Sequence, residues 1–211
     1  MSDHQLVKTP IVKKAKERKT PFFTKDLVKC VIVLASIALV ASLLLGVMNW
    51  LTYVDPAETI MKEVAGYFGT DLSAVSKDES MAGENVNACF VATKDGDTVL
   101  GYCFYAVGTG AKDGTMELLV YINGEGVITE ITCYSQGETA GYFDKVEKAN
   151  KSKYIGIDVD DIDGLTLIGS KDTPSGAGQI NAISGATYTS KGYHNAVAAA
   201  VNAYKQNKGV A

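Results

Sequence analysis

The sequence lacks the cysteine and histidine spacings that hold metals, and it lacks the motif of a serine hydrolase. Its 4 cysteines and 2 histidines form no C-x-x-C pair and no His-rich cluster, so no zinc site is indicated. There is no G-x-S-x-G segment, which a nucleophile elbow requires. His194 lies within an expected helix, and we expect it to be a helix-surface or packing residue rather than a base.

Positive charge is scarce over most of the chain. Residues 52–211 include 12 basic and 21 acidic residues, a net charge of −9, whereas the whole chain carries −4. Proteins bind phosphate backbones with clustered lysines and arginines, so the composition argues against nucleic acid as a partner. A hydrophobic content of 46% with 9% aromatic residues is typical of a folded protein.

Charge is absent altogether from residues 30–51, CVIVLASIALVASLLLGVMNWL. This length is enough to cross a hydrocarbon core of roughly 30 Å as one helix. The excess of lysine and arginine upstream predicts a cytoplasmic N-terminus. A cleavable signal peptide is the alternative, but it has a shorter apolar run and an A-x-A cleavage pattern. We expect a basic cytoplasmic tail over 1–26, a transmembrane helix over 27–51 and one extracytoplasmic domain over 52–211.

The remaining pattern predicts a single α+β domain, an antiparallel sheet flanked by helices. The turn signals Asp95-Gly96 and Asn123-Gly124 favour two hairpins. Strands are expected over 87–93, 98–107, 116–122 and 126–134, with a weak one over 164–169. Helices are expected over 55–69 and from about 190 to 205, and 143–154 is a short helix or a loop. Cys89 and Cys103 flank the first hairpin, which leaves a disulfide or buried free thiols as alternatives.

An unusual cluster of hydroxyls precedes the last expected helix, in ISGATYTSKG over 183–192. Thr189 or Ser190 is expected to cap that helix. Capping does not explain Ser184 and Thr187, which surround Gly185-Ala186. Small residues there let the backbone approach a ligand closely, and the following helix N-terminus suits a phosphate group.

Ser184, Gly185, Ala186 and Thr187 resemble the flavinylation motif D-x-x-S/T-G-A-T of the FMN-binding domain family. In that family a flavin transferase uses FAD to join FMN to the final threonine through a phosphoester bond. The resemblance therefore implies Thr187 as the attachment residue, with Thr189 following it. Asn181 stands where the family has aspartate, which keeps the size and the acceptor but loses the charge.

A second segment, Gln136–Tyr142, resembles the family's H-x-E-T-P-G-L-G, which lies beside the flavin. This resemblance implies that Glu138, Thr139 and Gly141 are flavin neighbours, with Gln136 in the place of the histidine. Taken without the first motif, GETAG would be interpreted as a polar turn.

The layout of tail, membrane helix, acidic domain and late SGAT resembles the G subunits of Rnf complexes, which are ferredoxin:NAD oxidoreductases that pump Na⁺ or H⁺. The C subunit of the Na⁺-translocating NADH:quinone reductase shares this layout. The resemblance implies an electron-carrying subunit in a bacterial or archaeal cytoplasmic membrane. Its implied partners are a D-type flavin subunit, A/E-type iron–sulfur subunits and, during maturation, a flavin transferase. A stand-alone extracytoplasmic flavin reductase and a redox-inert ectodomain remain as alternatives.

Overall fold

The structure, a computed structural model, describes residues 25–53, 55–96, 98–110, 114–139 and 141–208. The chain divides into two units, residues 1–53 and 54–211. In the first unit, helix α1 spans Lys25–Thr52, and all of its residues are exposed. Among the described residues, α1 supplies the one candidate membrane span, by length and apolar composition. It covers the predicted transmembrane segment 27–51, whereas most of the predicted tail lies outside the described residues.

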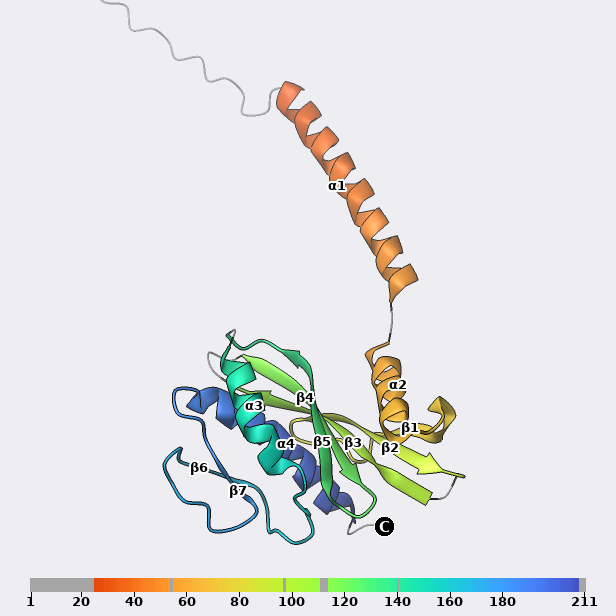
Figure 1. Cartoon of the computed structure of the whole chain (residues 1–211). Coiled ribbons are helices and arrows are strands. Elements are labelled where there is room, and N and C mark those ends of the chain that lie inside the picture. Colours follow the sequence, from red (N-terminus) through yellow and green to blue (C-terminus); the bar gives the residue numbers. More distant parts are fainter. Residues whose placement is uncertain (1–24, 54, 97, 111–113, 140, 209–211) are drawn as a thin grey trace, which may run out of the picture. The chain divides into compact units, whose positions relative to one another are not determined.

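The second unit is built on a five-stranded antiparallel meander in which neighbours in sequence are neighbours in the sheet (Figure 1). All four strands predicted for the two hairpins are present, with slightly different ends, and an unpredicted short polar strand adds an edge. Asp95 and Gly96 take positive φ values of 53° and 87° in the first hairpin turn, as an Asp-Gly turn requires. The strands are β1 Val75–Asp78, β2 Val86–Lys94, β3 Thr98–Thr109, β4 Thr115–Asn123 and β5 Ile128–Gln136.

Helix α2, Pro56–Phe68, begins and ends as its sequence predicts. The Asp55 side chain accepts a hydrogen bond from the backbone N–H of Ala57, and Gly69 closes the helix with φ 65°. Ile60 and Val64 are buried and form a core with residues of β1–β4 such as Phe90 and Tyr121. A one-turn 3-10 helix, η1 Leu72–Ala74, leads from α2 into β1.

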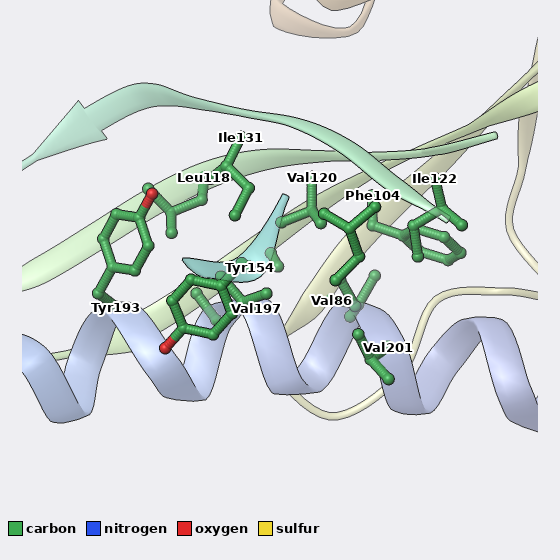
Figure 2. Close-up of a cluster of buried hydrophobic side chains, with 14 of the residues drawn as sticks. Val86, Phe104, Leu118, Val120, Ile122, Ile131, Tyr154, Tyr193, Val197 and Val201 are labelled. Atoms are coloured by element: carbon green, nitrogen blue, oxygen red, sulfur yellow. The ribbon is translucent and has the colours of Figure 1, made fainter. Parts of the chain in front are cut away.

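The opposite face of the sheet is covered by α3, Tyr142–Tyr154, and α4, Thr187–Lys208. The larger core lies here, where Val197 and Val201 of α4 meet Phe104 and Val120 of the sheet (Figure 2). The domain is therefore α+β, as predicted, and its elements form three layers. Residues 143–154 form a helix rather than a loop.

The expected weak strand over 164–169 is β6, Thr166–Ile168. It pairs in parallel with β7, Gln179–Asn181, a strand that was not predicted. The last helix begins at Thr187, not near Ser190, so the predicted start was wrong by three residues.

Cys89 and Cys103 are free thiols, so the disulfide alternative is wrong. Cys89 pairs with Phe104 and Phe90 pairs with Cys103 across β2 and β3. Adjacent positions on a strand point to opposite faces, and the two thiols accordingly belong to different cores, Cys89 beneath α4 and Cys103 beneath α2. Burial accounts for both cysteines without any bond between them.

Two glycines set how closely α4 approaches the sheet. A Cβ placed on Gly108 of β3 would lie 1.9 Å from the carbonyl oxygen of Gly192 in α4. On the other side of this contact, a Cβ on Gly192 would lie 2.8 Å from the backbone nitrogen of Gly110. Because neither position has room for a side chain, the first turns of α4 rest directly on the backbone of β3. This contact fixes where the start of α4 lies.

Candidate functional site: the turn before helix α4

The turn Ser184–Ala186 is held against the first turn of α4 by one hydroxyl. Ser190 Oγ accepts a hydrogen bond of 2.9 Å from the N–H of Ile183 and donates one of 2.9 Å to the carbonyl of Ala186. Gly185 lies between them with φ 77°, a conformation that a residue with a Cβ rarely adopts. Ser190 is thus inside the helix and clamps the turn, and the prediction that it caps the helix was wrong.

Thr189 does not cap the helix either. It is 1% exposed, and its hydroxyl donates a 2.7 Å hydrogen bond to Oε2 of Glu138. Glu138 is itself 8% exposed, and its Oε1 lies 2.1 Å from the position that a Cβ on Gly110 would take. The two predicted segments, around residues 138 and 187, are therefore joined by a buried bond.

Thr187 is the first residue of α4, and both it and Ser184 are exposed. The N–H groups in the first turn of a helix have no acceptors within the helix, and the helix dipole makes this end partly positive. Lys145, from α3, donates a 2.8 Å hydrogen bond to the carbonyl of Ser184. Its ammonium lies 3.7 Å from the Cβ position of Gly185. A cation, free N–H groups and an exposed hydroxyl therefore meet at one turn.

A hollow of about 380 Å³ adjoins Thr187, and residues of both predicted segments line it. Its lining residues are Thr139, Tyr142, Gly185, Ala186, Thr187, Tyr188 and Thr189. This volume is within the range of about 300–1,000 Å³ found for small-ligand sites. A larger hollow of about 710 Å³ lies beside residues 153–179, but none of the predicted site residues lines it.

Two predicted flavin neighbours act on the backbone instead of lining the hollow. Gln136 accepts a 2.8 Å hydrogen bond from the N–H of Glu138 through Oε1, which orients the segment. Gly141 takes φ 85° immediately before α3, which lets the chain turn into that helix. Sequence reasoning missed Lys145, Tyr142 and Tyr188. Tyr188 stands next to the motif threonine, and that position was the available signal for it.

Asn181, which replaces the motif aspartate, is occupied by internal contacts. Its side-chain Nδ2 donates hydrogen bonds of 2.9 Å to the carbonyl of Gly169 and 2.8 Å to that of Asp172. Its own carbonyl accepts a 3.2 Å bond from Asn150 in α3. A carboxylate has no donor for those two carbonyls. The asparagine therefore holds the loop between β6 and β7.

His194 is a packing residue, which agrees with the expectation from its position in a helix. It is 6% exposed, and its Nδ1 lies 3.0 Å from the hydroxyl of Tyr154. Burial lowers the pKa of His194 below its ordinary value of 6.5, because the charged imidazolium loses hydration. His194 does not line the hollow beside Thr187.

Known proteins are similar to this chain over much of its length. Residues 112–202 match the model of the FMN-binding domain family. The chain is 26% identical over 205 residues to the G subunit of the ion-translocating oxidoreductase complex of Shewanella piezotolerans, covering 87% of this chain and 92% of that one. It is 25% identical over 162 residues to the G subunit of the Na⁺-translocating ferredoxin:NAD⁺ oxidoreductase complex of Acetobacterium woodii, covering 75% and 76%.

The crystal structure of Shewanella oneidensis NqrC aligns with a TM-score of 0.42 and 20% identity, over 64% of this chain and 71% of that one. The family match and the two relatives point to one class of protein, since the matched residues include Thr139, Thr187 and the whole turn between β7 and α4. Over residues 112–202 the chain matches the FMN-binding domain family, and over most of its length it is similar to the G subunits of ion-translocating oxidoreductase complexes.

Proposed function

We propose that the chain is the electron-carrying subunit of a membrane-bound, ion-translocating ferredoxin:NAD oxidoreductase, with FMN joined covalently to Thr187. The observation that carries the proposal is the position of Thr187 Oγ1. Thr187 is an exposed residue at the start of α4, and it lines a hollow together with Thr139 and Gly185. The match to the FMN-binding domain family supports FMN as the attached cofactor. The two relatives, which are subunits of ion-translocating oxidoreductase complexes, support the proposed type of complex.

The residues at the turn suit the phosphate end of FMN. The N–H groups of the first turn of α4 and the Lys145 ammonium offset the charge of a phosphodiester. Gly185, with φ 77°, leaves the approach to Thr187 free of a side chain. The hollow beside these groups takes the rest of the molecule. The bound flavin supplies reversible electron transfer, and the protein supplies its position and surroundings.

Attachment requires a donor and a leaving group, both of which FAD provides. In the proposed reaction Thr187 Oγ1 attacks the phosphorus of the FMN half of FAD. The new O–P bond forms as the pyrophosphate bond breaks, AMP leaves, and the hydroxyl proton passes to solvent. A separate flavin transferase catalyses this step. Thr187 is thus an attachment residue and takes no part in later electron transfer.

Helix α1 anchors the protein in the proposed arrangement, with the N-terminal tail in the cytoplasm and residues 52–211 outside. Its 28 residues exceed the roughly 20 that a hydrocarbon core needs. A D-type flavin subunit and A/E-type iron–sulfur subunits are the proposed electron partners. Protease added to intact spheroplasts should therefore digest the FMN-binding domain. Survival of that domain would show that it lies on the cytoplasmic side and would contradict the proposed orientation.

Mass spectrometry of the full-length protein, co-expressed with a flavin transferase, tests the covalent bond. The peptide containing Thr187 should gain the mass of FMN less one water, and Thr187→Val should abolish the gain. Ser152→Ala is the control, because Ser152 is an exposed hydroxyl on α3, outside the motif and the hollow, and should leave attachment intact. An unmodified Thr187 in the presence of an active transferase would refute the proposal.

A further inference from the structure

Two tyrosines at the hollow are exposed to an unusual degree. Tyr188 is 74% exposed and Tyr142 is 46% exposed. They are the two most exposed large hydrophobic side chains among the described residues from 55 to 208; the others are Tyr67, Leu72, Val99 and Ile155, at 37–41%. Large aromatic side chains normally bury most of their surface, so this pair calls for an explanation.

Both tyrosines line the same hollow, although they come from different elements. Tyr142 is the first residue of α3 and Tyr188 the second residue of α4, and each contributes to the wall beside Thr187. Neither side chain has a ring or hydrogen-bond partner within the described part of the chain. By contrast, the third most exposed tyrosine of this unit, Tyr67, packs on Tyr121 with ring centroids 4.3 Å apart.

A bound ligand would bury the exposed surface of these two tyrosines. The ligand best suited to two phenol rings is a flat aromatic one. Offset or edge-to-face contacts between rings add specific attraction to the burial of area. Tyr188 directly follows the residue that would be joined to the ligand. A ring tethered at Thr187 is therefore held at high local concentration beside both phenols.

We propose that Tyr142 and Tyr188 are the residues that bind the isoalloxazine ring, and that they set its fluorescence and its reduction potential. This inference rests on the proposed attachment of FMN to Thr187. In this proposal the two phenols hold the ring in position beside Thr187. Because an electron-rich phenol ring disfavours added negative charge on a stacked flavin, the pair also holds the flavin's midpoint potential down.

The fluorescence lifetime of the flavin reports such contact directly. A phenol in contact with an excited isoalloxazine transfers one electron to it, and the electron then returns, so the pair ends unchanged and the emission is quenched. A short lifetime therefore needs a tyrosine close to the ring. Unfolding would also separate the ring from the tyrosines and lengthen the lifetime, so each variant must first show the circular dichroism spectrum of the wild-type fold.

The experiment uses full-length protein loaded with FMN by the transferase, with the flavin on Thr187 checked by mass spectrometry in each sample. Tyr142→Leu, Tyr188→Leu and the double variant are compared with Tyr67→Leu, an exposed tyrosine on α2 that does not line the hollow. Both single variants should lengthen the lifetime, and the double variant should lengthen it severalfold. The midpoint potential should rise in the same order, and Tyr67→Leu should change neither quantity.

A lifetime that does not change in the double variant, with FMN confirmed on Thr187, would overturn the inference and leave the proposed function standing. A change in only one single variant would overturn the contact from both sides. Wild-type protein without FMN on Thr187 would overturn the proposed function, and the inference with it. The mass spectra separate this last outcome from the other two.

Discussion

The hydroxyl of Thr189 donates a 2.7 Å hydrogen bond to the carboxylate of Glu138, across 51 positions of sequence and in the buried interior. This bond joins the first turn of α4 to the segment that follows β5. Thr139 and Thr187 line one hollow, so residues of the two short motifs meet at a single candidate site. The neighbouring Thr187, two positions earlier, is exposed and has a separate role.

Valine is nearly isosteric with threonine, and it separates these two roles. Thr189→Val removes a hydrogen bond to a buried carboxylate, and we expect it to lower the free energy of unfolding by about 1–3 kcal/mol. Thr187→Val lies on the surface and should change stability by less than about 0.5 kcal/mol, while abolishing FMN attachment. Urea unfolding measures the first quantity and protein-bound flavin the second. Equal stability losses in the two variants would contradict the assignment of a structural role to Thr189 and an attachment role to Thr187.

The close contact between Gly108 and Gly192 predicts a severe effect of a single methyl group. Gly108→Ala places a Cβ 1.9 Å from the Gly192 carbonyl, so α4 must shift, at a cost of about 1–3 kcal/mol or more. The same substitution at Gly66, exposed in α2 with nothing within 4 Å, should stabilise by about 1 kcal/mol. Thermal unfolding of the two variants tests the contrast, and a Gly108→Ala protein of native stability would disprove the backbone contact.

Lys145 is expected to assist attachment of FMN. Lys145→Met removes the ammonium that bonds the Ser184 carbonyl and should slow the transferase reaction by leaving the phosphate end without its cation. Lys145→Arg should restore most of the rate. Lys148→Met, also exposed on α3, is the control and should be modified at the wild-type rate. The time course of covalent flavin in a purified transferase assay gives the rates, and identical rates in all four proteins would remove Lys145 from the site.

The cysteines of the second unit, residues 54–211, should resist thiol reagents in the native state. Burial raises the pKa of Cys103 well above its ordinary value. Burial and the nearby Glu147 raise the pKa of Cys133 to about 11. Since the thiolate is the reactive form, labelling near pH 8 should be slow at Cys133 and absent at Cys89 and Cys103. A Cys30→Ser background removes the exposed thiol of α1, and full labelling should appear only in denaturant.

Because His194 is buried, we expect the protein to lose stability in mild acid. Burial lowers the pKa of His194 below 6.5 in the folded state. Between this lowered pKa and 6.5, His194 is therefore protonated in the unfolded chain but neutral in the folded chain. The contribution of His194 to stability is thus complete above pH 6.5 and falls as the pH drops through that value towards the lowered pKa. His194→Gln should show a smaller fall in unfolding midpoint between about pH 7.5 and 5.5. An identical fall in both proteins would assign the acid sensitivity to other groups.

Local patterns were sufficient to predict most of the elements. Asp55 and Pro56 marked the start of α2, and the Asp95-Gly96 turn marked the first hairpin, because caps and tight turns depend on neighbouring residues alone. Two short strands escaped prediction: β1 and β7 have four and three residues and depend on their pairing partners. The start of α4 was misplaced because Ser190, a good capping residue, bonds Ile183 and Ala186 from inside the helix.

The sequence by itself determined the apolar helix, the α+β class and, through SGAT and ETAG, the two segments that belong to the site. Each of these features is recognisable from residues close together in the chain, through their composition, their hydrophobic period or a short motif. Only the tertiary structure decided that Thr189 binds Glu138, that Lys145 reaches Ser184, and that Tyr142 and Tyr188 face one hollow. These contacts depend on how closely α4 rests on β3, and that distance is set by two glycines 84 positions apart, a relationship that no local pattern carries.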